Sequence, residues 1–164
     1  MVNAYILLGA NLGNKLATFI RAKEQVANRV GRIVRQSGVY ESEAWGFVAN
    51  EPFYNQVLEV ETALAPSALL SELLTIEGNL GRVRSSSVEY QSRPIDIDIL
   101  LYGDQQVSLP TLTIPHPRMH ERMFTLVPLS ELIPDYIHPT LKKPVRVLLK
   151  ECPDKGEVRR VESA

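Results

Sequence analysis

The sequence predicts a single α+β domain over residues 1–164, in which helices cover one face of an antiparallel sheet. Two stretches carry apolar residues at helical spacing and end at a glycine, and the stretches around them are short and apolar or alternate as strands do. A chain of 164 residues can bury one sizeable core and is too short for two ordinary domains.

The first half of the chain predicts a strand, a helix and two further strands. Residues 4–8 are apolar strand formers that run into the turn Gly9–Gly13, and apolar residues then recur at helical spacing as far as Gly31, a candidate helix cap. Residues 41–52 lack periodicity and predict a long loop. The predicted elements are a helix from about Asn14 to Val30, a second strand from Arg32 to Tyr40 and a third strand from Phe53 to Thr62.

The second half predicts a helix, a strand and a proline-rich extension. Pro66 suits a first helical turn, and an apolar stripe then runs from Leu69 to Leu80. Residues 82–92 are polar and without period, so they form either a lid or a solvated linker. Alternation resumes over Ile95–Tyr102. Beyond this strand, the predicted elements are short helices at Pro117–Arg122 and Thr125–Leu132 and a last short element at Val145–Lys150.

This order of strand, helix, strand, strand, helix and strand matches the split βαβ arrangement, in which the two middle strands pair antiparallel. No internal repeat interrupts the order. The predicted fold is therefore a ferredoxin-like βαββαβ sandwich with helices on one face of the sheet, followed by an irregular C-terminal extension.

Two carboxylates and an arginine coincide with strict alternation in one stretch. On a strand the three isoleucines face one way, whereas Asp96 and Asp98 share the other face, with Cα atoms about 6.5 Å apart. Burying carboxylates without partners is costly, so the pair should meet a metal ion, an arginine such as Arg93, or both. A hydrogen-bonded or solvated rim is the structural alternative. Leu100 and Tyr102 continue the same face, which predicts a strand buried on both faces further along.

Three further groups of residues suggest phosphates and a flat ring. Magnesium is typically held by one or two carboxylates plus substrate phosphates, and arginines can neutralise the remaining phosphate oxygens. Taken alone, the arginines could be surface charges and the phenylalanines core residues. The groups are Arg82, Arg84 and Arg93; His116, Arg118 and Arg122; and Trp45, Phe53, Asn55 and Phe124.

Composition and charge argue against several classes of protein. A formal charge of -1 gives no electrostatic case for a nucleic-acid or membrane-surface partner. The single cysteine, Cys152, excludes an intrachain disulfide, and residues 1–5 lack the basic start of a signal peptide. No apolar run reaches the roughly 18 residues of a membrane span. We expect a cytoplasmic chain with small-molecule partners and without nucleic-acid or membrane partners; His138 is interpreted as a surface residue.

Five motifs lie in register along the chain: Gly9–Gly13, Phe53–Asn55, Gly81–Arg84, Arg93–Ile99 and Pro115–Phe124. In this order and spacing, residues 4–135 resemble 6-hydroxymethyl-7,8-dihydropterin pyrophosphokinase, the folate-pathway diphosphokinase family. The resemblance implies transfer of the terminal diphosphate of ATP, as one unit, to the hydroxymethyl group of the pterin, with release of AMP. It also implies two Mg²⁺ ions and ATP as co-substrate, and we expect a monomer.

The resemblance also implies roles for individual residues. Asp96 and Asp98 would hold the metal ions, and Asp96 could also help to take the proton from the attacking hydroxyl, unless the metal alone acidifies it. The pterin ring would lie between Phe53 and Phe124. The implied catalytic residues are Arg82, Arg93, Asp96 and Asp98. The implied substrate contacts are Ser42, Trp45, Phe53, Asn55 and Phe124. The implied ATP contacts are Leu70, Glu77, Arg84, Arg93, Ile99, Leu112, Thr113, His116 and Arg122.

The chain departs from the family at a few positions. Many bacterial members carry Arg-Trp-x-Pro where this chain has Glu89–Ser92, and some have an arginine at the position of Thr111 and a tyrosine at that of Pro117. Three other functions are weighed beside the diphosphokinase: a non-catalytic nucleotide-binding module, an RNA-binding sheet of the same topology, and a metal-dependent kinase that releases ADP. The RNA-binding sheet lacks its aromatic motif and basic charge here.

Overall fold

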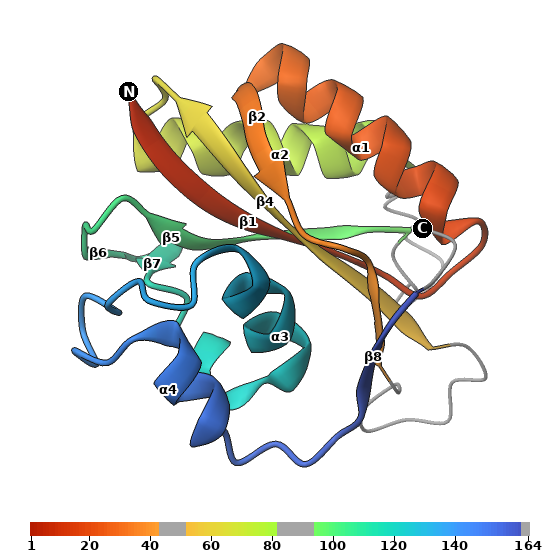
Figure 1. Cartoon of the computed structure of the whole chain (residues 1–164). Coiled ribbons are helices and arrows are strands. Elements are labelled where there is room, and N and C mark those ends of the chain that lie inside the picture. Colours follow the sequence, from red (N-terminus) through yellow and green to blue (C-terminus); the bar gives the residue numbers. More distant parts are fainter. Residues whose placement is uncertain (43–51, 82–93, 162–164) are drawn as a thin grey trace.

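The computed structural model describes residues 1–42, 52–81 and 94–161, which form a six-stranded antiparallel sheet with helices on both faces (Figure 1). Its strands are β1 (Val2–Ala10), β2 (Gly31–Gln36), β3 (Tyr40–Ser42), β4 (Phe53–Thr62), β5 (Asp96–Tyr102) and β8 (Val158–Arg160). The hydrogen-bonded order is β5, β1, β4, β3 and β8, and β2 also pairs with β4.

Helices cover the two faces of this sheet (Figure 1). They are α1 (Lys15–Arg29), α2 (Pro66–Asn79), α3 (Met123–Leu132) and α4 (Val145–Lys150), with a 3-10 turn η1 (Met119–Glu121) and a separate hairpin of β6 (Val107–Leu109) and β7 (Leu112–Ile114). One core lies between the sheet and the α1–α2 layer, and a second core lies between the sheet and the α3–α4 layer. Over the described ranges, no helix is both long and apolar enough to cross a membrane.

The strand order confirms the predicted ferredoxin-like fold. The first and last strands of the βαββαβ unit, β1 and β5, pair antiparallel, and the middle strands β2 and β3 pair with β4. The helices α1 and α2 lie on the same face of the sheet, as predicted. The α+β class therefore holds, and the differences concern single residues and the C-terminal extension.

The helix α1 begins and ends where its sequence predicts, although Gly31 has a different role. The Asn14 side chain accepts the N–H of Ala17 at 3.1 Å and caps the helix, and Val30 is its C-cap. Gly31 is the first residue of β2, and a Cβ there would overlap the backbone carbonyl of Glu61 on β4. Close approach of two strands, and not helix capping, therefore requires this glycine.

The predicted second strand, Arg32 to Tyr40, is two strands in the structure. The interruption lies at Ser37, whose hydroxyl accepts the N–H of Val57 at 2.9 Å while its own N–H donates to the Val57 carbonyl at 2.9 Å. A hydrogen bond to the Ser37 side chain thus replaces one backbone hydrogen bond of the regular ladder. Beyond the interruption, β3 carries Ser42 along the edge of β4.

The acid-bearing strand β5 contains a β-bulge, because its pairing with β1 skips Leu100. Leu100 and Leu101 both pack in the α3–α4 core, and Tyr102 packs in the α1–α2 core. The prediction that Tyr102 continues the face of Asp98 was therefore wrong, since the extra residue reverses the alternation. The predicted burial on both faces was confirmed.

The C-terminal extension is more regular than the irregular segment that the sequence predicts. The helix α3 begins at Met123, two residues before the predicted Thr125, and the helix predicted at Pro117–Arg122 is reduced to the turn η1. The last predicted element is confirmed as α4 at Val145–Lys150. The strands β6, β7 and β8 were not predicted, and β8 adds a strand to the main sheet.

His138 is buried, with 4% of its surface exposed, and the interpretation as a surface residue was wrong. Its Nδ1 accepts the N–H of Thr140 at 3.1 Å and the N–H of Leu141 at 3.0 Å. Burial lowers the pKa of His138 to about 4, and the nearby His120 adds to this effect. A neutral imidazole therefore holds the turn that precedes α4.

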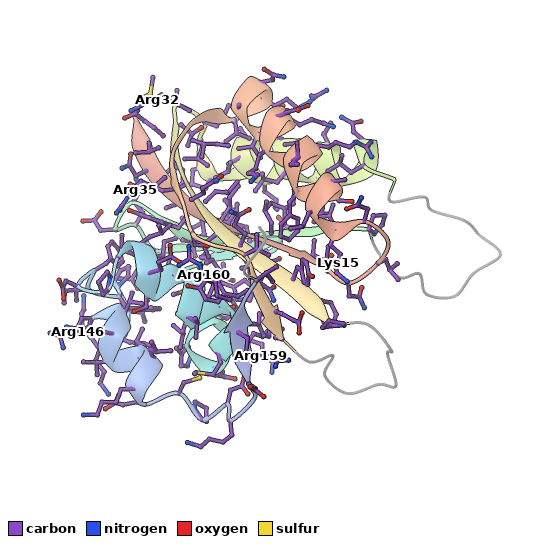
Figure 2. All side chains as sticks on the ribbon, turned by 45° about the vertical axis from the view of Figure 1, so that its right-hand side comes forward. Lys15, Arg32, Arg35, Arg146, Arg159 and Arg160 are labelled. Carbon is purple, nitrogen blue, oxygen red and sulfur yellow. The ribbon has the colours of Figure 1, made fainter. Side chains whose placement is uncertain are left out.

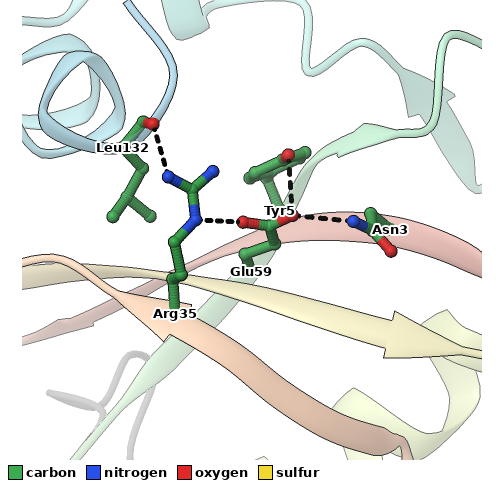
Figure 3. A network of polar contacts seen from close by, with 5 residues as sticks. All are labelled: Asn3, Tyr5, Arg35, Glu59 and Leu132. Atoms are coloured by element: carbon green, nitrogen blue, oxygen red, sulfur yellow. Dashed lines mark hydrogen bonds and ion pairs between the residues drawn. The ribbon is translucent and has the colours of Figure 1, made fainter.

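A buried carboxylate ties the sheet to α3 (Figure 3). Glu59 on β4 accepts a hydrogen bond from the Asn3 amide at 2.7 Å and another from the Tyr5 hydroxyl at 3.1 Å. Arg35 donates to Glu59 at 2.7 Å and to the carbonyl of Leu132, the last residue of α3, at 2.9 Å. Burial, followed by the charge of Glu59, raises the pKa of Tyr5 to about 12. The network thus anchors the C-terminal end of α3 on the sheet.

Basic side chains outside this network are spread over several elements (Figure 2). Three of those labelled in the figure pair with carboxylates at or near the surface, and such pairs contribute only about 0–1 kcal/mol each. The pairs are Arg32 with Glu61 at 3.8 Å, Arg146 with Asp135 at 3.1 Å and Arg159 with Glu41 at 3.3 Å. The last pair joins β8 to β3.

Candidate active site

A cavity of about 510 Å³ lies on the α3 side of the sheet, where β1, β4 and β5 meet the start of α3. Strand residues, helix residues and residues near the C-terminus all contribute to it. Its lining residues are Leu7, Gly9, Ser42, Phe53, Asn55, Asp96, Asp98, Arg118, Glu121, Arg122, Phe124, Pro153 and Asp154.

The strand register aligns three lining residues in one row. Gly9 on β1 pairs with Asn55 on β4 and, on its other side, with Asp96 on β5. Neighbouring strands lie about 4.8 Å apart, so the backbones of Asn55 and Asp96 are roughly 10 Å apart across Gly9. The row that contains Leu7 and Asp98 lies beside it. The sheet therefore fixes an amide and two carboxylates at defined distances in one cavity.

Gly9 keeps the space between the amide and the acids open. A Cβ at this position would lie 3.2 Å from the Asn55 Oδ1, which is tighter than an ordinary van der Waals contact. The sequence analysis assigned Gly9 to the turn Gly9–Gly13, whereas the structure places it inside β1. Extending the alternation of residues 4–8 by one step could have identified it as a residue that shares the face of Leu7.

The amide and two aromatic rings predicted for a flat ligand line this one cavity. Asn55 is only 3% exposed, and its Nδ2 donates to the Ser42 Oγ on β3 at 3.3 Å. Phe53 is the first residue of β4, and Phe124 lies in the first turn of α3. The guanidinium carbon of Arg122 lies 5.5 Å from the centre of the Phe124 ring, within the range of a cation–π interaction.

His116 interacts electrostatically with Asp98, Arg118 and Arg122. Its backbone N–H donates to the Leu100 carbonyl at 3.0 Å, and its Nδ1 accepts the N–H of Arg118 at 3.2 Å. Burial lowers the pKa of His116; Asp98 opposes this effect, and the two arginines add to it. Burial also lowers the pKa of Arg122. A neutral imidazole that accepts at Nδ1 carries its proton on Nε2.

Most of the other implied ATP contacts gather at the edge of the sheet formed by β5. They lie on α2, on β5 and on β7, and both α2 and β7 pack against β5. Buried Glu77 accepts the N–H of Ile97 at 2.7 Å, so it holds the strand at the residue between the two acids. Ile99 is buried on the α1–α2 side. The residues of this group are Leu70, Glu77, Ile99, Leu112 and Thr113, and they do not line the cavity.

The structure thus brings together about half of the residues that the sequence analysis singled out. Those that line the cavity are Ser42, Phe53, Asn55, Asp96, Asp98, Arg118, Arg122 and Phe124. Four predicted residues lie outside the described ranges: Trp45, Arg82, Arg84 and Arg93. The lining residues without a predicted role are Leu7, Gly9, Glu121, Pro153 and Asp154. Pro153 and Asp154 follow the last recognised motif, and no pattern in the sequence identifies them.

The donor set of the cavity fits a hard divalent cation. Asp96 and Asp98 present carboxylates on one face of β5, beside open space. Magnesium binds oxygen ligands and is commonly held by one or two carboxylates plus substrate phosphates and water. Within residues 1–42, 52–81 and 94–161, no three His, Cys, Asp or Glu side chains are grouped to hold a metal ion. The two acids therefore suit an ion that completes its coordination with substrate oxygens.

Comparisons with known proteins agree with this arrangement. Residues 5–134 match the family 7,8-dihydro-6-hydroxymethylpterin-pyrophosphokinase (HPPK). The chain is 40% identical over 146 residues to the 2-amino-4-hydroxy-6-hydroxymethyldihydropteridine pyrophosphokinase of Porphyromonas gingivalis, covering 88% of this chain and 99% of that protein. It is 38% identical over 146 residues to the protein of the same name from Aquifex aeolicus, covering 89% of both chains.

A solved structure supports the fold. The crystal structure of wild-type Plasmodium falciparum HPPK-DHPS with pteroate superposes with a TM-score of 0.71 over 92% of this chain, at 17% identity. The chain spans less than half of that protein, 44% of its length, and the likeness concerns the fold alone. Because the family match covers most of the chain and two relatives near 40% identity align over most of their length, the chain belongs to the 7,8-dihydro-6-hydroxymethylpterin-pyrophosphokinase family.

Proposed function

We propose that this chain transfers the terminal diphosphate of ATP, as one unit, to the hydroxymethyl oxygen of 6-hydroxymethyl-7,8-dihydropterin. The products are AMP and the pterin diphosphate, an intermediate of folate biosynthesis. The observation that supports this proposal is the row of Asn55, Gly9 and Asp96, since an amide that would suit the polar edge of a ring and an acid that would suit a cation line one cavity. Membership of the family supports the reaction.

The pterin end of the proposed site is formed by Phe53, Phe124 and Asn55. The two phenyl rings would stack on the faces of the pterin, and the amide would bind its polar edge. Because Ser42 holds the Nδ2 of Asn55, the Oδ1 is the atom that would accept N–H groups of the pterin. The roughly 10 Å between the backbones of Asn55 and Asp96 would accommodate the ring and bring its hydroxymethyl group toward the acids.

The diphosphate end is formed by Asp96 and Asp98, which would hold two Mg²⁺ ions. Bound Mg²⁺ would neutralise phosphate charge and acidify the substrate hydroxyl. Asp96 would accept the hydroxyl proton if metal coordination alone does not suffice. His116, neutral and protonated on Nε2, would donate a hydrogen bond to a phosphate oxygen, and Arg122 would add positive charge.

Other residues are assigned by the family resemblance alone. Arg82 and Arg93 would stabilise the charge that develops during transfer, and Arg84 would contact ATP; all three lie outside the described residues. The nucleotide would bind along the β5 edge, where Glu77 fixes the backbone of the acid-bearing strand. With the nucleotide at the β5 edge and the pterin beside Asn55, the two substrates would lie on opposite sides of Asp96 and Asp98.

We further propose that residues 1–164 form one domain, active as a monomer in the cytoplasm. The strand β8, close to the C-terminus, joins the sheet that begins with β1, and this supports a single folding unit. Light scattering coupled to size-exclusion chromatography would measure the mass of the particle that carries the activity. A dimeric mass would contradict the monomer.

The test is to incubate the protein with ATP, magnesium and 6-hydroxymethyl-7,8-dihydropterin and to separate the nucleotides by chromatography. AMP that accumulates in step with pterin diphosphate is the expected result. ADP would indicate transfer of a single phosphoryl group by an ordinary kinase, and pterin binding without nucleotide turnover would indicate a binding module. Omitting magnesium and adding a chelator should abolish AMP formation, because the negatively charged acids repel the phosphates unless a cation lies between them.

A further inference from the structure

The cavity has a wall that lies beyond the family match, which ends at residue 134. Pro153 and Asp154 line this wall. The segment that carries them runs from α4 to β8 (Figure 1) and is fastened at both ends. Cys152 is buried in the α3–α4 core, and the N–H of Val161 donates to the Val39 carbonyl at 2.8 Å. The wall is therefore a fixed part of the fold.

Asp154 joins this segment to the start of α3. Its Oδ2 accepts the N–H of Met123 at 3.0 Å, and its Oδ1 accepts the N–H of Gly156 at 2.8 Å. Met123 is the first residue of α3, and the N-cap residue Arg122 makes no side-chain hydrogen bond to the helix. The Asp154 carboxylate thus satisfies a terminal N–H of α3 from a distant part of the chain, with a charge that suits a helix N-terminus.

The same segment also supports the opposite side of the cavity. The strand β8 pairs antiparallel with β3, and Val158 lies opposite Ser42. Ser42 in turn accepts the hydrogen bond from Asn55. The segment therefore connects the helix that carries Phe124 with the strand that orients the Asn55 amide.

We propose that Asp154 is a positioning residue for pterin recognition, acting through the start of α3 as part of the pocket wall formed by Pro153 and Asp154. This proposal rests on the proposed function. Asp154 accepts the N–H of Met123, the residue before Phe124, and so helps to fix the position of the Phe124 ring in the cavity that Phe53 also lines. The nucleotide contacts proposed on the β5 edge lie on α2, β5 and β7. Arg122, which would add positive charge at the phosphates, also lies at the start of α3. Loss of Asp154 should therefore weaken pterin binding more than nucleotide binding.

The test compares Asp154→Ala, Asp154→Asn and the control Glu157→Ala, which removes an exposed carboxylate three residues further along. Calorimetry would measure the dissociation constants of 6-hydroxymethylpterin, with a saturating non-hydrolysable ATP analogue, and of that analogue alone. We expect about fivefold weaker pterin binding for Asp154→Ala, the fold-change that corresponds to about 1 kcal/mol for a lost cap. Asparagine keeps one of the two acceptor oxygens that bind Met123 and Gly156, so Asp154→Asn should weaken pterin binding less than Asp154→Ala does. Glu157→Ala should bind pterin like the wild type.

A second variant removes the hydrogen-bond donor, the N–H of Met123, and keeps the acceptor Asp154. Met123→Pro eliminates the N–H, and proline is tolerated at the first position of a helix. Arg122, with φ -128° and ψ 115°, has the extended conformation that suits the residue before a proline. Met123→Pro should bind pterin about fivefold more weakly than Met123→Ala, which controls for the loss of the methionine side chain. Adding Asp154→Ala to Met123→Pro should cause no further loss of pterin affinity.

Several results would overturn the proposal. Unchanged pterin affinity in Asp154→Ala, or equal losses for pterin and nucleotide, would show that Asp154 does not position the ring. If the losses of pterin affinity in Asp154→Ala and Met123→Pro add up in the double variant, the hydrogen bond between these two residues is not the cause of the weaker binding. If the wild-type protein neither binds the pterin nor forms AMP, the proposed function fails together with this inference, and that result is visible before any variant is made.

Discussion

Replacing Gly9 with alanine tests whether the pterin binds in the part of the cavity beside Gly9, between Asn55 and Asp96. The new Cβ would stand 3.2 Å from the Asn55 Oδ1, so the amide would have to shift by a few tenths of an ångström. Asn55 is almost fully buried and is held on its other side by Ser42. The amide has little room to adjust, and its alignment with the pterin should be impaired.

The size of the effect follows from the loss of one hydrogen bond. A neutral hydrogen bond contributes about 0.5–1.5 kcal/mol net, which corresponds to a factor of roughly 2 to 12 in binding. We therefore expect the KM for the pterin to rise between about twofold and tenfold in Gly9→Ala. The KM for ATP should be unchanged, because the nucleotide is proposed to bind at the β5 edge. The described glycines with positive φ are Gly13, Gly81 and Gly103, so the backbone at Gly9 accepts alanine.

The assay is the initial rate of AMP formation at varied pterin with saturating ATP, and then at varied ATP with saturating pterin. Gly78→Ala is the matched control, since a Cβ at this position on α2 meets nothing within 4 Å. It should leave both KM values unchanged and raise the free energy of unfolding by about 0.5–1 kcal/mol. A wild-type pterin KM in Gly9→Ala, or a parallel rise in both KM values, would refute the reasoning.

Three further predictions concern the acids, the buried network and pH. Asp98→Asn should abolish AMP formation without shifting the thermal unfolding midpoint, because a charged metal ligand is lost; wild-type turnover would contradict the magnesium assignment. Glu59→Ala should lower the free energy of unfolding in urea by about 3 kcal/mol, since the Tyr5 hydroxyl and the Arg35 guanidinium lose their acceptor, and a loss below about 1 kcal/mol would contradict the anchoring role. The unfolded chain protonates His138 near pH 6.5 and the folded chain only at about 4, so its contribution is fully present above pH 6.5 and is lost as the pH falls toward 4, by up to about 3 kcal/mol. Urea unfolding at pH 7 and pH 4 should show a smaller fall in the free energy of unfolding for His138→Gln than for the wild type. An equal fall in both proteins would contradict the assignment of this pH dependence to His138.

Elements with a clear internal period could be predicted from the sequence to within a few residues. The helices α1 and α2 match their predicted ranges, because burial on one face imposes the period on the local sequence. The strand β4, which is buried on both faces, also matches its predicted range. The alternation that placed Asp96 and Asp98 on one face holds as far as the bulge at Leu100. For the candidate site, Ser42, Phe53, Asn55, Asp96, Asp98 and Phe124 were anticipated with the help of the family resemblance, whereas Leu7 and Gly9 were not.

Features that depend on a distant part of the chain could not be predicted. The bulge at Leu100 is defined by the pairing of β5 with β1, a strand far away in the sequence. Gly31 is needed because β4 passes close to it, and no neighbour in the sequence reveals that contact. The strand β8 is a short polar segment, Val158–Arg160, and it becomes a strand by pairing with β3. Asp154 acquires its role only when the fold brings α3 beside it.

The two parts of the candidate site are held by different kinds of structure, and this should separate their responses to mutation. Asn55 and Asp96 are coupled through the paired strands β4, β1 and β5, so their spacing cannot change without breaking ladder hydrogen bonds. Phe124 instead stands at the start of α3, whose position depends on the Glu59 network at one end and on Asp154 at the other. Changes at these two anchors should therefore alter how tightly the ring is bound without moving the acids, whereas changes of the acids themselves should alter how the bound substrate reacts. At saturating pterin, a variant of Asp154 should form AMP at nearly the wild-type rate, and a variant of Asp98 should not.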